Sequence, residues 1–340
     1  FSAADTVSKA DGGQFDGNVT MAGTLGVTGV FTGTSLDISG NIDIDGTTET
    51  DVLTINGSQL KYKTFGTSSL LFGDDSTGTI DGANFNTGVG DNVFGALTTG
   101  DHNTLTGYNS GASITSGESN TLFGSTSGDA LVGGDKNTVV GSNALSSDTE
   151  GNRSTAIGYQ ALNAQNFTSS TDANNTAVGY QAGLSITTGV QNVLMGNHAG
   201  DSLTDADFNV AIGYAALDAD TLGSRSVAIG YNALGTQNFS SATETGNTAV
   251  GFGAGGAVTT GTNNAIFGFE AGNVFTTGVR NTLIGKSSGA AIATSNSDNT
   301  FIGHGAGSTV TSGDANTILG RFNGNQNSLD IRTSSNTITL

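Results

Sequence analysis

A five-residue phrase, Asn/Ser-x-x-apolar-Gly, recurs along most of this chain at nearly constant spacing. Successive anchor glycines are 17 residues apart, except for two intervals of 21 and one of 18. A repeat this short falls below the ~33 residues of helical-pair repeats, and no stretch shows sustained 3.6-residue periodicity. We therefore expect one stacked coil per repeat. The anchors are Gly73, Gly90, Gly107, Gly124, Gly141, Gly158, Gly179, Gly196, Gly213, Gly230, Gly251, Gly268, Gly285, Gly303 and Gly320.

Each repeat is typical of short strands joined by tight turns. Residues 175–179 (Asn-Thr-Ala-Val-Gly) predict one strand, and residues 184–188 (Leu-Ser-Ile-Thr-Thr) predict a second. Glycine supplies a positive φ where the chain turns, and asparagine is the next best residue for that conformation. Asparagine stands four residues before the anchor in 12 of 15 repeats, as Asn120, Asn175 and Asn247 do, and serine in the other three. The unit is therefore predicted to be one coil of a parallel β-solenoid.

Both sides of the predicted strand are apolar. The residues one and three positions before the anchor share one side, and the residue two positions before it points the opposite way. We assign the first side to the core of the coil. Because the second side is also apolar, we expect something to cover it from outside. Other copies of the same chain are our explanation.

Composition excludes several classes of protein. A net charge of −19 and a pI near 4.1 argue against nucleic-acid binding, which needs clustered Lys and Arg. The absence of Cys excludes disulfides, thiolate zinc sites and cysteine nucleophiles. No apolar run approaches the ~20 residues of a membrane span, so no membrane insertion is expected.

The rhythm of the sequence divides the chain into three parts. Residues 1–60 carry short alternating strands with Gly, Asp-Gly and Asn-Gly turns, which predict a thin fibrous β-shaft. Residues 61–323 predict a roll of about 15 coils, roughly 67 Å long at ~4.8 Å per coil. Residues 324–340 predict two strands around Ser334-Ser335, leading to a further domain.

The two 21-residue intervals contain near copies of one insertion. Residues 165–171 (Gln-Asn-Phe-Thr-Ser-Ser-Thr) match residues 237–243 (Gln-Asn-Phe-Ser-Ser-Ala-Thr), 72 positions later, which indicates duplication of a four-coil block. Each insertion is expected to project as a bulge carrying Phe167 or Phe239. These rings could contact a receptor, or they could cap the core or a neighbouring chain.

The phrases Arg-Ser-Val-Ala-Ile-Gly-Tyr-Asn-Ala-Leu (225–234) and Asn-Thr-Ala-Val-Gly (247–251) resemble the head repeat of trimeric autotransporter adhesins. That resemblance implies a left-handed parallel β-roll in a homotrimer, although the coil here is longer than the usual adhesin unit. Residues 17–30 look like the shaft of phage tail fibres, and residues 329–340 are similar to segments that precede C-terminal assembly domains in such fibres. Together they imply a host-recognising fibre, with a phage preferred over a bacterial surface.

Residues that could carry chemistry form no convincing site. His102, His198 and His304 occupy different offsets in their coils, so we expect no catalytic or metal site and no cofactor. The pairs Asp205/Asp207 and Asp218/Asp220 leave a weak glycan hydrolase open, because such enzymes need two carboxyls ~5–10 Å apart. A column of threonines suggests ice binding, but we place it on the core side. Its members are Thr104, Thr121, Thr138, Thr155, Thr176, Thr248 and Thr282.

The sequence therefore predicts an all-β homotrimeric rod that is not an enzyme. Its predicted role is that of a structural virion protein in a phage tail fibre, extracellular, joined to other tail proteins and presenting a tip to a glycan or outer-membrane receptor. The alternatives are a bacterial trimeric surface adhesin and, less favoured, a lone ice-binding solenoid.

Overall fold

The computed structural model describes residues 53–55, 58–60, 62–73, 77–292 and 294–340. The chain divides into two units, Phe1–Asp51 and Val52–Leu340. The predicted shaft, residues 1–60, therefore lies outside the described residues, apart from the antiparallel pair β1 (Leu53–Ile55) and β2 (Ser58–Leu60).

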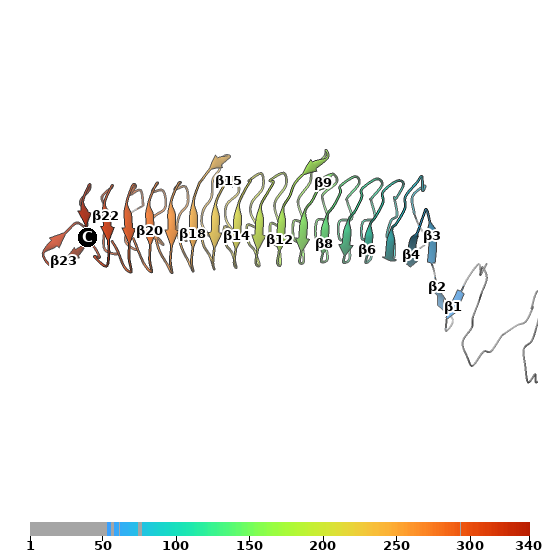
Figure 1. Cartoon of the computed structure of the whole chain (residues 1–340), viewed down its shortest axis with the longest axis horizontal. Helices are drawn as coiled ribbons and strands as arrows, with labels where there is room; N and C mark the ends of the chain where they lie inside the picture. Colours follow the sequence, from blue (N-terminus) through green and yellow to red (C-terminus); the bar gives the residue numbers. More distant parts are fainter. Residues whose placement is uncertain (1–52, 56–57, 61, 74–76, 293) are drawn as a thin grey trace, which may run out of the picture. The chain divides into compact units, whose positions relative to one another are not determined.

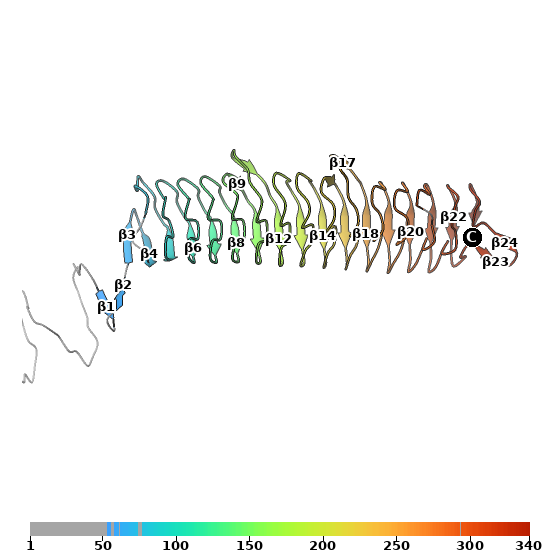
Figure 2. The ribbon, with the colours of Figure 1, turned by 180° about the vertical axis from the view of Figure 1, so that it is seen from behind.

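The second unit is a parallel β-solenoid in which each coil contributes one short strand (Figures 1 and 2). Equivalent residues pair from coil to coil, as Thr155, Thr176 and Val193 do. The prediction of an all-β parallel solenoid with 17-residue coils is confirmed. Its strands are β4 (Ser69–Gly73), β5 (Thr87–Gly90), β6 (Thr104–Thr106), β7 (Thr121–Phe123), β8 (Thr138–Val140), β10 (Thr155–Ile157), β12 (Thr176–Val178), β13 (Val193–Met195), β14 (Val210–Ile212), β16 (Val227–Ile229), β18 (Thr248–Val250), β19 (Ala265–Phe267), β20 (Thr282–Ile284), β21 (Thr300–Ile302), β22 (Thr317–Leu319) and β25 (Ile338–Thr339).

The second strand predicted in each repeat is wrong. Residues 184–188 form turns and bends, although their amides still bond to the next coil, as Thr187 N–H does to Thr204 O at 2.9 Å. The cause is local, because Gln181 and Gly183 both have positive φ values, 55° and 59°. Such residues curl the chain instead of extending it, so most coils have one strand and a stack of turns opposite it.

The assignment of the two sides of the strand is reversed. The residue two positions before the anchor points into the coil and is buried, as Leu122, Ala177 and Leu194 are. The residues one and three positions before it lie on the outer face, as Thr121 and Phe123 do. The side that we expected other chains to cover is therefore the core.

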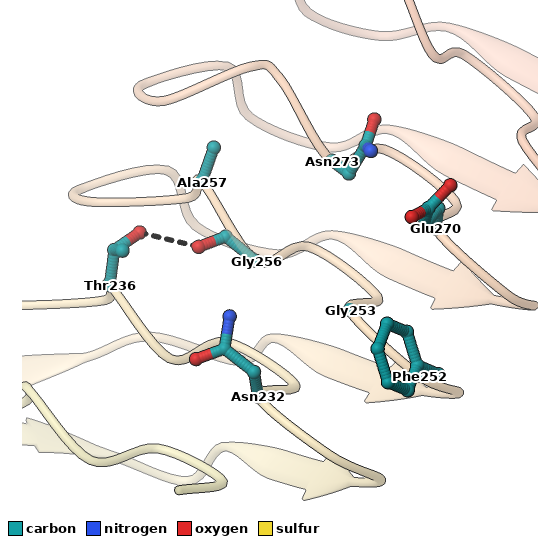
Figure 3. A pocket seen from close by; sticks show the side chains of 8 residues that line it. All are labelled: Asn232, Thr236, Phe252, Gly253, Gly256, Ala257, Glu270 and Asn273. Atoms are coloured by element: carbon teal, nitrogen blue, oxygen red, sulfur yellow. Dashed lines mark hydrogen bonds between the residues drawn. The ribbon is translucent and has the colours of Figure 1, made fainter.

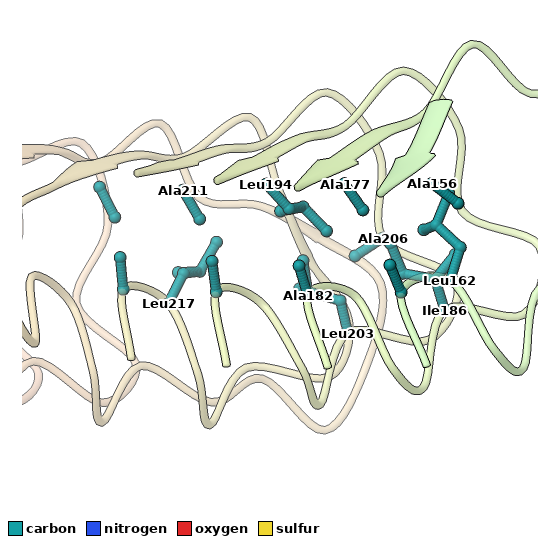
Figure 4. Packing of buried hydrophobic residues seen from close by; sticks show 14 of the residues in the cluster. Ala156, Leu162, Ala177, Ala182, Ile186, Leu194, Leu203, Ala206, Ala211 and Leu217 are labelled. Carbon is teal, nitrogen blue, oxygen red and sulfur yellow. The ribbon is translucent and has the colours of Figure 1, made fainter. Parts of the chain in front are cut away.

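Two further core positions, the fourth and the seventh after the anchor, compensate for each other in size (Figure 4). Where the seventh residue after the anchor is apolar, as Ile114 and Leu203 are, the fourth is glycine in most coils. A Cβ on Gly111 would lie 2.9 Å from Ile114 Cδ1, and one on Gly200 would lie 2.8 Å from Leu203 Cδ1. Where the seventh residue is polar, leucine takes the fourth position, as in Leu145, Leu162, Leu217 and Leu234.

Buried asparagines form a hydrogen-bonded ladder along the inside of the sheet edge. Asn192 N–H donates to Asn175 Oδ1 at 2.9 Å, and Asn192 Oδ1 accepts the N–H of Asn209 at 2.9 Å. Asn192 Nδ2 also donates to Ala206 O across the coil at 2.8 Å. These asparagines have no positive φ, so their role is this ladder and not the turn conformation that we expected.

The ladder continues through the two longer coils by a substitution. Ser154 replaces asparagine there, and Gln165 supplies the missing amide: its Nε2 donates to Ser154 Oγ at 3.0 Å, and its Oε1 accepts Asn175 Nδ2 at 2.9 Å. The second copy uses Ser226 and Gln237 in the same way. Each insertion therefore brings its own replacement for the ladder amide.

The anchor glycines are confirmed in the conformation that the repeat predicts. Their φ values run from +115° to +144°, a region that essentially only glycine occupies. A Cβ on Gly213 would also lie 2.6 Å from Gly230 O in the next coil. Many repeats carry a second glycine ten residues after the anchor, and there glycine is required by space and not by backbone conformation. Gly117 has no positive φ, but a Cβ there would lie 2.6 Å from Gly134 O.

The two ends of the sheet depart from the repeat. At the start, β3 (Tyr62–Phe65) pairs antiparallel with β4, a hairpin that the sequence did not predict. At the end, β23 (Asn325–Gln326) and β24 (Leu329–Asp330) form an antiparallel pair, while β25 adds to β22 in parallel. The predicted boundary at 323/324 is therefore not a boundary of the sheet.

Replacing one ladder asparagine by alanine should weaken its coil. Asn192→Ala leaves Asn209 N–H and Ala206 C=O without partners, at ~1–3 kcal/mol for each buried group, so we expect a loss of about 2–6 kcal/mol. Amide hydrogen exchange of the adjacent coils measures it. Exposed Asn197, whose amide oxygen accepts only a 3.4 Å bond from Tyr180 N–H, is the matched control. Equal exchange in both alanine variants would contradict the role of the ladder.

Candidate functional site: the outer face of the sheet

The outer face of the sheet consists of two columns of side chains that run the length of the solenoid. One column holds the residues three positions before the anchors Gly90 to Gly320: Thr87, Thr104, Thr121, Thr138, Thr155, Thr176, Val193, Val210, Val227, Thr248, Ala265, Thr282, Thr300 and Thr317. The other holds the residues one position before them: Val89, Thr106, Phe123, Val140, Ile157, Val178, Met195, Ile212, Ile229, Val250, Phe267, Ile284, Ile302 and Leu319. We call these 28 residues the outer face.

The outer face carries no charged side chain. At the 11% charged residues of the whole chain, about three of these 28 positions would be charged. Large apolar side chains lie open instead, with Phe123 58% and Leu319 51% exposed. At ~4.8 Å per coil and roughly 10 Å of width, the stripe covers about 600 Å², of which the apolar column supplies about half.

A column of aromatic rings follows the sheet at the position after the anchor. Tyr214, Tyr231, Phe252 and Phe269 stack with centroids 4.8 to 5.5 Å apart and planes within 11° of parallel. Tyr159 and Tyr180 stack in the same way, and His198 bridges edge-on from Tyr180 to Tyr214. Because the ring faces cover one another, this aromatic column presents ring edges and hydroxyls outward.

The two insertions project from the coils, near β9 (Gly151–Asn152) and β15 (Gly223–Ser224) in Figure 1. Each returns through a second short strand, β11 (Thr171–Asp172) and β17 (Thr243–Glu244), which pair in parallel with β9 and β15. Ion pairs tie their bases, Arg153 to Asp172 at 2.6 Å and Arg225 to Glu244 at 3.0 Å.

The rings of Phe167 and Phe239 do not project, contrary to expectation. Each is only 6% exposed. The buried Asp148 carboxylate accepts the N–H of Phe167 at 3.0 Å, and Asp220 accepts that of Phe239 at 3.1 Å. The carboxylates turn these residues toward the coil, so burial gives no support to a direct receptor contact and favours the capping alternative.

The carboxylates singled out in the sequence are engaged in stacking the coils. Asp205 Oδ1 accepts Thr188 Oγ1 at 2.7 Å, and Asp207 Oδ1 accepts Val190 N–H at 2.8 Å. Asp220 is buried under its insertion, while Asp218 lies at the surface, where partial burial, with the Asp201 charge adding to it, raises its pKa.

The histidines do not come together either. His102 stacks on Phe85 at 4.9 Å, His198 belongs to the aromatic column, and His304 lies exposed near the end of the solenoid. In the described part of the chain, no three His, Cys, Asp or Glu residues gather as metal ligands would. No helix in that part could cross a bilayer.

A shallow pocket of about 340 Å³ lies beside the aromatic column (Figure 3). It is a hollow between coils of the second insertion, closed on one side by the bond from Thr236 Oγ1 to Gly256 O at 2.7 Å. Its lining combines one ring edge, two amides and one carboxylate: Asn232, Thr236, Phe252, Gly253, Gly256, Ala257, Glu270 and Asn273.

The sequence reasoning missed the aromatic column, although a signal was present. Gly-Tyr or Gly-Phe stands at the anchor in seven coils, and all of these rings except Tyr108 belong to the aromatic column: Tyr108, Tyr159, Tyr180, Tyr214, Tyr231, Phe252 and Phe269. Comparison with known proteins adds no identity: no family model, no curated protein and no solved structure matches the chain. The structural repeat residues, by contrast, are all found stacked in register.

If Phe239 is structural, its truncation should cost stability. Phe239→Ala removes a nearly buried ring, so we expect a loss of about 3 kcal/mol by denaturant unfolding followed by circular dichroism. Phe208→Ala, which removes an exposed ring, should change stability by less than about 1 kcal/mol. An unchanged stability for Phe239→Ala, together with lost binding to host cells, would restore the receptor-contact interpretation.

Proposed function

We propose that this chain is the rod of a homotrimeric bacteriophage tail fibre, a structural virion protein that holds a host-binding tip at a distance. The observation that carries the proposal is the outer face: a charge-free stripe in which a column of apolar side chains runs beside a column of mostly threonines, along a protein of net charge −19. A stripe of about 600 Å² approaches the ~800 Å² that each partner buries in a stable protein interface. Self-association along the rod is the simplest way to remove it from water.

In-register repetition suits this role. Each coil presents the same pair of columns, so one coil-to-coil contact between two copies is repeated along their whole length. A second copy of the chain has the same coil-to-coil spacing, so its coils can contact those of the first copy along the whole length. An unrelated globular partner would contact only a few coils. We propose three copies because residues 225–234 resemble the head repeat of trimeric adhesins. We propose a phage protein because residues 17–30 resemble the shaft of phage tail fibres.

The alternative of a bacterial trimeric adhesin uses the same rod. The genes around the coding sequence would distinguish a phage fibre from a bacterial adhesin. A secretion signal upstream and a membrane barrel downstream would favour the adhesin, while neighbouring tail and capsid genes would favour the fibre.

One observation supports the alternative of a lone ice-binding solenoid. Ten of the 14 residues in the first column of the outer face are threonines, and they point outward, so our reason for setting ice binding aside was wrong. Against it, the second column varies from Thr106 to Phe123, which makes the face uneven. The fibre remains our preferred proposal.

The outer face should decide the oligomeric state. We expect the native mass by light scattering to be near three times 33.8 kDa. Phe123→Glu with Phe267→Glu should give a folded monomer, because the two charges would be buried between copies. Phe208→Glu, an exposed ring outside the outer face, should leave the trimer intact. A wild-type monomer at micromolar concentration would contradict the proposal.

Ice binding is tested on the same proteins. We expect no thermal hysteresis from the wild type or from the double variant, because Phe123, Met195 and Phe267 break the flatness of the face. A nanolitre osmometer measures the gap between melting and freezing points. A clear gap that falls in Thr138→Tyr would support the ice-binding alternative instead.

A further inference from the structure

A column of basic side chains continues the line of the aromatic column near the C-terminal end of the solenoid. Lys286, His304 and Arg321 each follow directly after an anchor glycine. Strands β20, β21 and β22 pair in register, with Ile284 opposite Ile302 and Ile302 opposite Leu319. The three side chains therefore start from equivalent positions on adjacent coils, ~5 Å apart, and all three residues are exposed.

These cations differ from the other arginines of the protein because no carboxylate neutralises them. Four arginines form ion pairs with nearby acids: Arg153 with Asp172, Arg225 with Glu244, Arg280 with Asp298 and Arg332 with Asp330. Lys286 and Arg321 form none within the described residues. The Lys286 ammonium lies instead over the ring of Phe269, 5.4 Å from its centroid.

Two acids that precede these anchors are engaged elsewhere. Asp298 holds Arg280 through two hydrogen bonds of 2.6 and 2.9 Å, and Asp314 Oδ1 accepts the N–H of Ser297 at 2.8 Å. Within the described residues, neither they nor Glu270, which follows Phe269 in the sequence, forms an ion pair with Lys286 or Arg321.

A pocket of about 190 Å³ opens at this column. His304 and Arg321 line it together with three side chains that can bond hydroxyl groups, Ser308, Asn323 and Gln326. The combination gives cationic donors for one anionic group and neutral polar groups for what surrounds it. Lys286 does not line this pocket, but it starts from the coil next to that of His304.

We propose that this basic column is a binding site for the carboxylate or phosphate group of an acidic saccharide. Lys286 and Arg321 would flank the anion, and Ser308, Asn323 and Gln326 would bond the sugar hydroxyls. A polyanion such as a nucleic acid is disfavoured, because the 29 acidic residues of the chain outnumber its 10 lysines and arginines and would repel it. The proposal rests on the proposed function, since it supplies the glycan contact that the buried Phe167 and Phe239 do not.

The test is a titration of the full chain with three small sugars, followed by saturation-transfer NMR and calorimetry at low salt. Glucuronate carries the carboxylate, glucose 6-phosphate carries the phosphate, and glucose carries neither. We expect at least one acidic sugar to bind with a Kd in the millimolar range and glucose to bind at least tenfold more weakly. The two acidic sugars separate a uronic-acid ligand from a phosphorylated one.

Variants locate the site. Lys286→Gln with Arg321→Gln should raise the Kd of the acidic sugar at least tenfold. Lys136→Gln, which neutralises an exposed lysine of a different column, should change it less than twofold. Circular dichroism should confirm that the variants fold, as expected for exposed side chains. Binding of glucose as tight as that of both acids, or equal weakening by the double variant and Lys136→Gln, would overturn the site.

The outcome is separable from that of the fibre proposal. A trimer that binds neither acidic sugar would overturn only the saccharide site. A monomer that binds one of them through Lys286 and Arg321 would support the site and overturn only the trimeric rod.

Discussion

The stacking of identical backbone positions is the constraint on which the rest of this structure depends. Each anchor glycine lies so close to the next that a Cβ would come within 2.2 to 2.7 Å of backbone atoms in the following coil along most of the sheet. The buried amide ladder ties the same coils through bonds of about 2.9 Å, as between Asn175, Asn192 and Asn209. A coil that lost register would place unpaired amides in a dry interior. The 17-residue period is therefore enforced by close backbone approach and by buried polar pairing together.

This constraint explains the form that the two four-residue insertions take. The two 21-residue intervals place serine in the ladder, at Ser154 and Ser226, and return a glutamine to the same place. A buried aspartate then holds both the glutamine and the start of the loop, with Gln165 Nε2 2.5 Å from Asp148 Oδ2. The extra residues are confined outside the coil, so register passes unchanged from β10 to β12 and from β16 to β18. The two copies share this solution because they share a sequence.

Much of the fold is predictable because the repeat directly encodes backbone geometry. A glycine at fixed spacing preceded by β-branched residues gives the strand, its parallel pairing and the turn. The inward side was not predictable from hydrophobicity, because positions such as Leu122 and Phe123 are equally apolar. Side-chain size decides it: the inner position accepts Ala156, Ala177 and Ala211, while the outer position keeps larger residues. The asparagine carried the same information. It stands two residues before the inner position, so both side chains point to the same side of the strand, and a ladder of buried amides lies on the side away from water.

The candidate site follows from what the repeat leaves unspecified. Inside the coil, close packing restricts almost every position, so variation there is limited to exchanges such as Gly for Leu at the fourth residue after the anchor. The position directly after the anchor is outside and under no such restraint. From Ser125 onward it changes in blocks: serine at Ser125 and Ser142, rings from Tyr159 to Phe269 interrupted by Asn197, then the basic residues Lys286, His304 and Arg321. Stacking on adjacent coils turns each block into a continuous surface of one chemistry. In this solenoid, the strand and the turn that follows it therefore serve two different functions. The outer face keeps one uniform composition, which suits association with identical copies, while the neighbouring column varies along the rod and can distinguish one ligand from another.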